Sequence, residues 1–280
     1  MQSQAKGPTH LEVGGVSVPK IGYGTFRLTG EPCERGVATA IEVGYRHIDT
    51  AQVYGNETEV GRGIRAAGVA RRDLFVTTKL KGDDLRPARL PQALAKCLER
   101  LGTDYVDLLL IHWPNPEVPV GETLGAMEAQ SRAGRARLLG VSNFPVALVR
   151  QAAATGIPIV CNQVEYHPFL SQRPVLDELR KHRMMLTAYC PIAKGTVAED
   201  PTIRRIAAKH GRSETQVTLR WLIDQPNVAA VPKSATPARI RANFQVFDFA
   251  LDADDRRAID GVACGRRLVN PAWSPVWDAA

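Results

Sequence analysis

Short apolar runs rich in valine, isoleucine and leucine recur along the chain, and each is followed by a stretch with helical periodicity. The runs predict eight strands, at Lys20–Tyr23, His47–Asp49, Phe75–Thr78, Val106–Ile111, Leu138–Val141, Val160–Val164, Met185–Ala188 and Val228–Val231. Between them we expect amphipathic helices at Cys33–Val43, Glu57–Ala67, Ala88–Leu101, Gly121–Ala133, Val146–Ala154, Pro174–His182, Ile203–His210 and Glu214–Asp224. Strands that alternate with helices at roughly 25–30-residue intervals indicate β/α units and a parallel sheet.

Eight such units most simply close into a (β/α)8 barrel, the TIM-barrel fold of the α/β class. We expect one domain over residues 1–280, because single barrels typically have about 250 residues. A doubly wound open sheet is the alternative that this pattern leaves open.

Two segments lie outside the repeat. Residues 10–19 predict an N-terminal β-hairpin with a Gly14-Gly15 turn, which we expect to plug the lower end of the barrel. A last short helix is expected at Asp252–Ile259. Residues 262–280 carry two prolines and two tryptophans without periodicity, so we expect an irregular C-terminal tail over the barrel mouth.

Composition and charge argue against several classes of function. The net charge is +7, and the basic residues are scattered in isolated pairs, which is typical of a solvated surface and not of a nucleic-acid-binding arm. Five widely spaced cysteines without a C-x-x-C motif indicate free thiols in a reducing compartment. The first ten residues lack the apolar segment of a secretory signal, and no apolar run approaches the ~18 residues of a membrane span. We therefore expect a cytoplasmic protein without nucleic-acid or membrane partners.

Polar residues follow three consecutive predicted strands, where a barrel carries its catalytic groups. Asp49, Lys79 and His112 end these strands, and Tyr54 lies in the loop after the first of them. Singly, each has a simpler explanation: a helix cap, a solvated lysine, a packed histidine and a core tyrosine. Their convergence on one rim favours a catalytic site.

The chemistry that these four groups suit is proton transfer to a carbonyl oxygen. A free tyrosine has a pKa near 10, and we expect the Lys79 ammonium to lower the pKa of Tyr54. Asp49 can pair with Lys79 and hold it in place, while His112 can orient the carbonyl or share the proton. Because none of the four supplies a hydride, a cofactor must do so.

Seven motifs resemble the aldo-keto reductase family, in order and over nearly the whole chain. They are HIDTAQVYGNETEVG (47–61), TTKL (77–80), LIHWP (110–114), GVSNF (140–144), NQVEYHP (162–168), AYCP (188–191) and VPKSATPARIRAN (231–243). The resemblance implies a catalytic tetrad of Asp49, Tyr54, Lys79 and His112, with Tyr54 as proton donor.

A basic loop follows the last predicted strand. Lys233 and Arg239 suit a phosphate monoester, although a basic helix start is the plain alternative, and no G-x-G-x-x-G supports a Rossmann site. The resemblance implies that this loop holds the 2′-phosphate of NADPH, that Ser142, Asn143 and Gln163 bind the nicotinamide carboxamide, and that Tyr189 stacks on the ring. The full set of expected cofactor-binding residues is Thr25, Phe26, Ser142, Asn143, Gln163, Tyr189, Cys190, Pro191, Ile192, Lys233, Ser234, Ala235, Thr236, Arg239 and Asn243.

Short connections after the fourth and seventh strands suggest an open site for small substrates. The ending RRLVNPAWSPVWD (266–278) looks like that of bacterial 2,5-diketo-D-gluconate reductases, a subgroup that also reduces methylglyoxal and keto esters. Lys81 stands where the family often has tryptophan; a cation there favours anionic substrates, unless the side chain simply faces solvent. Expected substrate-binding residues are Phe26, Tyr54, Lys81, His112, Trp113 and Trp273.

Two other functions fit the sequence less well. A non-catalytic NADPH-binding regulatory barrel would not need the complete tetrad. A metal-dependent hydrolase would need an H-x-H motif and further histidine ligands, and the six histidines lack that spacing. We therefore expect a monomeric, metal-free NADPH-dependent reductase of small carbonyl compounds.

Overall fold

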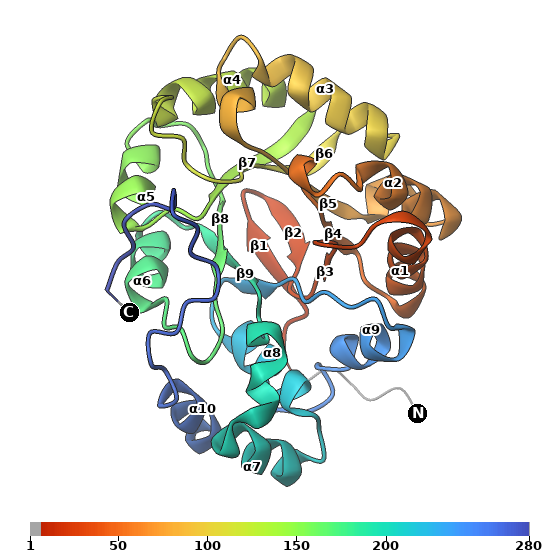
Figure 1. Cartoon of the computed structure of the whole chain (residues 1–280), viewed down its shortest axis with the longest axis vertical. Coiled ribbons are helices and arrows are strands. Elements are labelled where there is room, and N and C mark those ends of the chain that lie inside the picture. Colours follow the sequence, from red (N-terminus) through yellow and green to blue (C-terminus); the bar gives the residue numbers. More distant parts are fainter. Residues whose placement is uncertain (1–6, 280) are drawn as a thin grey trace.

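Eight parallel strands follow one another in chain order around a barrel in the computed structural model, which describes residues 7–279 (Figure 1). The strands are β3 (Tyr23–Gly24), β4 (His47–Asp49), β5 (Phe75–Leu80), β6 (Val106–Ile111), β7 (Ala136–Ser142), β8 (Cys161–Glu165), β9 (Met185–Tyr189) and β10 (Val228–Ala230). Each pairs in parallel with the next strand in the chain.

The barrel closes where the first strand meets the last. Ile21 forms a parallel bridge with Ala230, whose N–H donates to the Lys20 carbonyl at 2.8 Å, and the Gly22 N–H donates to the Ala230 carbonyl at 2.9 Å. A Cβ on Gly24 would lie 2.8 Å from the Val231 carbonyl oxygen, so this approach requires glycine. The predicted barrel is confirmed, and an open doubly wound sheet is excluded, because its strand order reverses at a switch point.

The first strand differs from its predicted extent. We expected Lys20–Tyr23, whereas β3 itself covers only Tyr23–Gly24, which pair with β4. Along the other edge, Lys20, Gly22 and Gly24 bond to β10 and the residues that follow it. This two-sided pairing depends on strand stagger, which no local pattern encodes.

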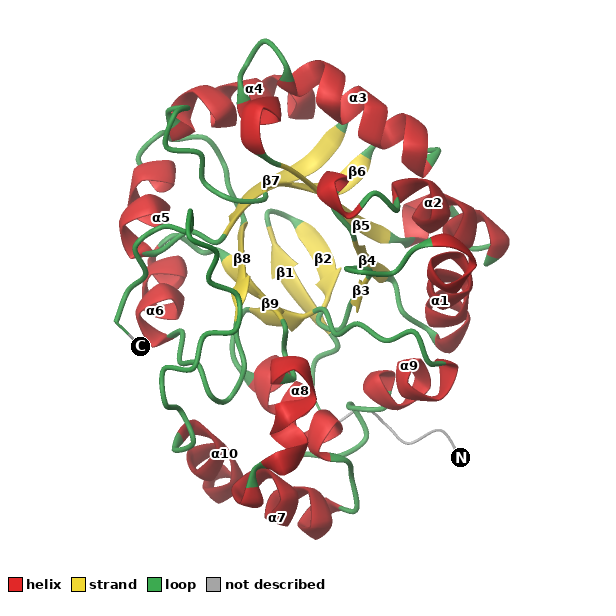
Figure 2. Cartoon of the chain, in the orientation of Figure 1, coloured by secondary structure: helices red, strands yellow, loops and turns green. Residues whose placement is uncertain are grey.

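Ten helices in the described chain surround the strands (Figure 2). They are α1 (Gly30–Val43), α2 (Glu57–Ala66), α3 (Leu90–Leu101), α4 (Val120–Arg132), α5 (Val146–Ala153), α6 (Arg173–Lys181), α7 (Pro201–His210), α8 (Glu214–Asp224), α9 (Pro237–Phe244) and α10 (Ala253–Asp260).

The third helix shows why these segments are helical. In α3 the leucines at positions 90, 94, 98 and 101 share one buried face, and burial of each side chain contributes about 1.5–3 kcal/mol. Gly102 ends the helix at a φ of 67°, in the left-handed region that favours glycine.

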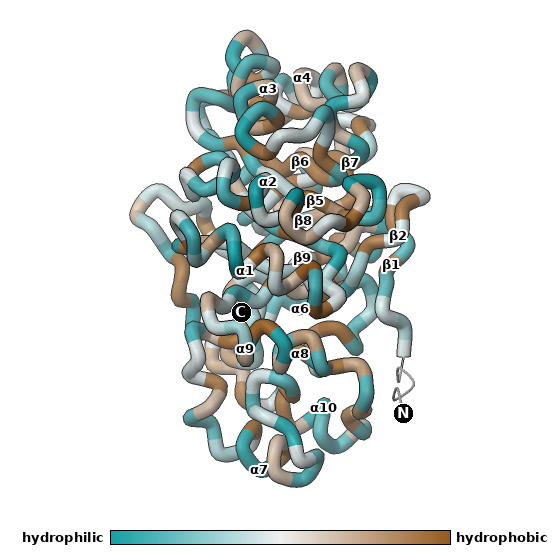
Figure 3. Tube along the Cα trace, turned by 90° about the vertical axis from the view of Figure 1, so that its right-hand side faces the viewer, coloured by the Kyte–Doolittle hydropathy of each residue, from teal (hydrophilic) through white to brown (hydrophobic). Residues whose placement is uncertain are grey.

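The N-terminal hairpin closes the lower end of the barrel, as predicted. Strands β1 (His10–Val13) and β2 (Val16–Pro19) are antiparallel, and Gly14 and Gly15 turn at φ values of 56° and 73°. Leu11, Val13 and Val18 join an apolar cluster with residues of β5 to β10 that face the barrel interior. Figure 3 shows the hairpin at one end of the barrel axis. The lower barrel is therefore sealed by apolar contact, which leaves the other end for chemistry.

The tail after α10 contains no helix or strand through residue 279, as expected. Residues 1–6, which belong to the segment interpreted as lacking a secretory signal, and Ala280 lie outside the described residues. Among the helices of residues 7–279, none is long and apolar enough to cross a membrane.

Candidate active site

The four predicted catalytic residues meet at the upper end of the barrel. Asp49 ends β4, Lys79 lies near the end of β5, His112 follows β6, and Tyr54 ends the short 3-10 helix η1 (Gln52–Tyr54). The Lys79 Nζ lies 5.2 Å from the centre of the Tyr54 ring, and the Tyr54 and His112 rings are 5.6 Å apart. The fold thus brings together groups that are up to 63 positions apart in the sequence (112 minus 49).

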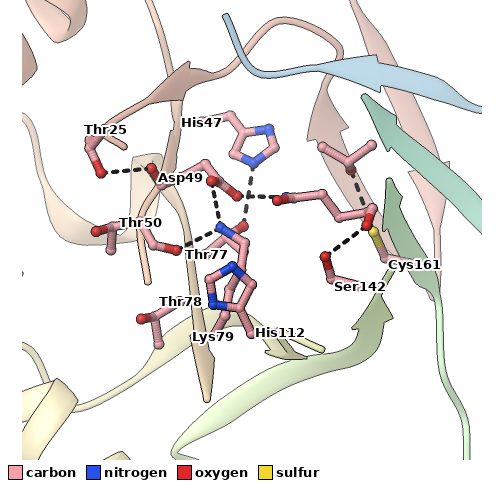
Figure 4. A network of polar contacts seen from close by, with 12 residues as sticks. Thr25, His47, Asp49, Thr50, Thr77, Thr78, Lys79, His112, Ser142 and Cys161 are labelled. Carbon is pink, nitrogen blue, oxygen red and sulfur yellow. Dashed lines mark hydrogen bonds and ion pairs between the residues drawn. The ribbon is translucent and has the colours of Figure 1, made fainter. Parts of the chain in front are cut away.

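A buried ion pair forms the floor of the site. The Lys79 Nζ donates to Asp49 Oδ1 at 2.6 Å and to the Thr50 carbonyl at 2.8 Å (Figure 4). Gln163 Nε2 donates to Asp49 Oδ2 at 2.7 Å. Lys79 is fully buried and Asp49 nearly so. Burial lowers the pKa of Lys79, and the Asp49 carboxylate opposes this change. Both charges are held by several partners, which a buried pair requires.

Tyr54 does not have the lowered pKa that we expected from Lys79. Loss of water around the phenol raises the pKa of Tyr54 well above 10, and the nearby Asp49 and Cys190 add to the increase. The expectation was wrong because burial and the negative charge of Asp49 outweigh the stabilisation of the phenolate by Lys79. Tyr54 therefore keeps its proton at neutral pH and can act as an acid.

His112 is buried as a neutral imidazole. Burial and the positive charges of Lys79 and Lys81 lower the pKa of His112 well below 6.5. Its Nδ1 is buried and has no hydrogen-bond partner among the described residues. A neutral imidazole beside Tyr54 can donate one hydrogen bond to a carbonyl oxygen.

The residues expected to bind a carboxamide lie beside the floor. Asn143, at a φ of 63°, donates from Nδ2 to the His112 carbonyl at 2.9 Å and accepts from the Tyr189 hydroxyl at 2.7 Å. Ser142 Oγ donates to the Gln163 carbonyl at 2.7 Å. One hydrogen-bonded network therefore links β4, β6, β7, β8 and β9.

The other residues expected at the mouth fall into two groups, one after β3 and one after β9. Thr25 is buried, and its hydroxyl donates to the Asp49 carbonyl at 3.0 Å, whereas Phe26 is 51% exposed with its ring 5.0 Å from that of Tyr54. Cys190, Pro191 and Ile192 follow β9. Burial raises the pKa of the Cys190 thiol to about 11, so it is not a thiolate at neutral pH.

The basic loop lies between β10 and α9. Its Ser234 carbonyl accepts a hydrogen bond from the Tyr23 hydroxyl at 2.6 Å, which ties the loop to β3. Lys233, Ala235 and Thr236 are exposed, as is Arg239 in the first turn of α9, whereas Asn243 on the same helix is buried. Neither Lys233 nor Arg239 is drawn into an ion pair by any residue that the structure describes. Two unpaired cations at a helix N-terminus suit a phosphate group.

Aromatic side chains form the rim. Trp273 of the tail packs edge-on against Trp113 with ring centres 4.9 Å apart, and the Trp277 ring lies 6.0 Å from Trp113. The Lys81 Nζ lies 3.9 Å from the centre of the Trp273 ring. The tail tryptophans therefore pack at the mouth, and Lys81 lies against one of them.

Glu165 holds the C-terminal tail, a role that the sequence motifs do not indicate. It ends β8 and accepts backbone hydrogen bonds from Leu268 at 2.7 Å and Val269 at 2.8 Å, and it pairs with His167 Nε2 at 2.9 Å. Burial would raise the pKa of Glu165, but these hydrogen bonds outweigh it and lower the pKa. The signal in the sequence is a glutamate directly after the predicted strand Val160–Val164, because a carboxylate buried at a strand end must have donors.

The tail is held at a second point, because the Val146 N–H donates to Asp278 Oδ2 at 2.9 Å.

Within residues 7–279, no three histidine, cysteine or acidic side chains are grouped so as to hold a metal ion.

Comparisons with known proteins agree with this geometry. A model of the aldo/keto reductase family matches residues 20–263. Methylglyoxal reductase DkgB of Escherichia coli O157:H7 is 40% identical over 268 residues, which is 94% of this chain and all of the relative. Aldo-keto reductase Rv2971 of Mycobacterium tuberculosis is 45% identical over 260 residues, 90% of each chain. The solved structure of a provisionally named 2,5-diketo-D-gluconic acid reductase B superposes with a TM-score of 0.94 at 41% identity and covers 99% of each chain.

Proposed function

The chain belongs to the aldo/keto reductase family, and we propose that it reduces small aldehydes and ketones to alcohols with NADPH as the hydride donor. The observation that carries the proposal is the meeting of Asp49, Tyr54, Lys79 and His112 at the open end of the barrel. An oxidoreductase of this kind needs a nicotinamide cofactor, and the residues at the mouth fit one.

The basic loop supports NADPH over NADH. The two cofactors differ by the 2′-phosphate, and Lys233 and Arg239 present exposed cations at the start of α9. Arg239 can bind phosphate oxygens with a bidentate fork, and Lys233 can add a point charge. Ser234, Ala235 and Thr236 complete the loop, and the buried amide of Asn243 lies one turn further along the helix.

The nicotinamide end would rest on the central network. Ser142, Asn143 and Gln163 offer hydroxyl and amide groups for the carboxamide, and the Tyr189 ring offers a stacking face. Bound NADPH supplies the hydride. Residues that fix one face of the ring toward the substrate reduce the entropic cost of the reaction.

Tyr54 is the proposed proton donor. As the carbonyl oxygen gains negative charge, it becomes far more basic than a phenolate, so transfer of the Tyr54 proton is favourable even with a raised pKa. Lys79, 5.2 Å from the ring, stabilises the phenolate that remains, and Asp49 holds Lys79 in position. Neutral His112 donates a hydrogen bond that orients the carbonyl. Solvent then returns a proton to Tyr54.

The substrates that we propose are small dicarbonyls such as methylglyoxal, keto-sugar acids such as 2,5-diketo-D-gluconate, and keto esters. Two relatives are named for the first two of these substrates. The connections at the mouth are short, including η3 (Gly82–Leu85) and η4 (Ala193–Glu199). We also propose a cytoplasmic monomer, and the five free thiols support a reducing compartment.

A screen of NADPH consumption tests the proposal. Purified protein is mixed with NADPH or NADH and with methylglyoxal, 2,5-diketo-D-gluconate, keto esters, aromatic aldehydes or steroids, and loss of reduced cofactor is followed by absorbance. We expect turnover of the small carbonyls with NADPH and much weaker turnover with NADH. Binding of NADPH without turnover of any carbonyl would instead favour a non-catalytic regulatory barrel.

A further inference from the structure

We propose that Lys81 is a specificity-determining residue that selects carbonyl substrates carrying a carboxylate, which it receives beside Trp273 at the barrel mouth. The inference rests on the proposed function and deepens it by naming the chemical class of substrate. The two named relatives leave this class open, since methylglyoxal is neutral whereas a diketogluconic acid is an anion at neutral pH.

Strand geometry explains why Lys81 faces the site. Successive side chains of a strand point to opposite faces, so residues two apart share a face. Lys79 ends in the barrel interior, and Lys81 continues β5 with extended φ and ψ of −144° and 159°. Lys81 therefore projects on the same side as the catalytic lysine, nearer to the mouth.

Aromatic contacts hold the ammonium there. The Lys81 Nζ lies 3.9 Å from the Trp273 ring centre, and Trp273 packs on Trp113, the neighbour of His112. Lys81 is only partly exposed, and its charge reaches the His112 imidazole. The cation thus lies beside the residue proposed to orient the carbonyl.

The charge of Lys81 is not neutralised by its neighbours. Its nearest acidic residues in sequence are occupied elsewhere: Asp83 pairs with Arg86 and Arg89, and Asp84 accepts from Gln52 at 2.6 Å. No ion pair to Lys81 exists within residues 7–279. An indole face attracts a cation without cancelling its charge, and an ammonium has three donors. At least one donor can therefore serve a substrate carboxylate.

A matched substrate pair tests this role. Phenylglyoxylate and its methyl ester share the same keto group and differ in charge. Steady-state kinetics with NADPH should show that Lys81→Met lowers kcat/KM for phenylglyoxylate about 10- to 100-fold, the loss of one charged hydrogen bond. The ester should change by no more than about threefold, since methionine keeps most of the side-chain volume on Trp273. Diketogluconate and methylglyoxal give a second pair with the same expected contrast.

Two control variants separate the local charge from other effects. Lys81→Arg keeps a cation and should retain most of the activity toward the acid. Arg89→Gln removes a charge that pairs with Asp83 on the outside of the same loop, and it should leave the ratio of acid to ester unchanged.

Three results would overturn the inference. An equal loss for acid and ester in Lys81→Met would mean that Lys81 only supports tail packing. Unchanged kcat/KM for both acid and ester in Lys81→Met, with the wild-type protein still reducing the ester, would refute anion selection and leave the reductase proposal intact. Absence of NADPH consumption with every carbonyl would refute the proposed function and the inference with it.

Discussion

The floor and the rim of the site use charge in opposite ways. On the floor, Asp49 and Lys79 are buried and satisfied by each other, by Thr50 and by Gln163. The rim also carries the cations Lys81, Lys233 and Arg239. These three have no acidic partner in the described part of the chain. The charged groups of the catalytic centre are therefore held in place by protein partners, whereas the cations proposed to bind an anion remain available for a ligand.

The difference follows from the cost of burial. A buried ion pair is tolerated only when its remaining donors and acceptors are satisfied, and loss of one partner leaves an uncompensated charge. An exposed cation stays hydrated and costs little until a ligand arrives. Changes on the floor should therefore affect turnover and stability, and changes on the rim should affect binding.

The largest effect is expected from Tyr54→Phe. Removal of the proton donor should reduce kcat about 10²- to 10⁴-fold, while the ring contacts with Phe26 and His112 remain. Steady-state kinetics measure kcat, and fluorescence titration with NADPH measures the affinity for the cofactor. Tyr105→Phe, just before β6 at the opposite end of the barrel, is the control. Near wild-type turnover in Tyr54→Phe would refute the assignment of the proton donor.

Arg239→Ala should have the next largest effect, and it should change cofactor binding without changing stability. Loss of one charged contact should raise the KM for NADPH about 10- to 100-fold, with little change in the KM for NADH or in the melting temperature. Arg241→Ala on the same helix is the matched control, because it removes an equal charge beyond the first turn. Equal increases for both cofactors would place the 2′-phosphate site elsewhere.

The smallest effect concerns acid stability. Burial lowers the pKa of both His47 and His112, so the folded protein keeps them neutral while the unfolded chain binds protons near pH 6.5. Their contribution to stability is complete above pH 6.5 and is lost as the pH falls toward the lowered folded values. His112 should reduce the free energy of unfolding by about 1 kcal/mol over the pH unit below 6.5, and His47 should add to this loss.

Urea unfolding at pH 7.5 and 5.5 measures this loss. A His47→Gln variant should show a smaller difference between the two pH values, whereas His10→Gln, at an exposed position, should match the wild-type protein. A free energy of unfolding that stays constant across this range would mean that His47 and His112 do not have lowered pKa values in the folded protein.

Much of this arrangement could be predicted because the periodicity of apolar residues is local. Strand ends at Asp49 and His112 were visible as polar residues after apolar runs, and a barrel necessarily brings such ends together. The pKa of Tyr54 could not be predicted in this way, because it depends on how much water the fold removes from the phenol. The short extent of β3, and the pairing of residues 20–24 with β10 at one edge and β4 at the other, depend on the stagger of the whole barrel.

The hydrogen bonds between Glu165 and the tail have a consequence for which tail sequences this barrel can accept. Glu165 binds Leu268 and Val269 through their main-chain amides, which every residue except proline provides. This attachment is therefore largely indifferent to tail sequence, whereas the contacts of Trp273, Trp277 and Asp278 depend on their side chains. A tail from a relative that keeps these three side chains should therefore be accepted by this barrel without a change in the catalytic centre.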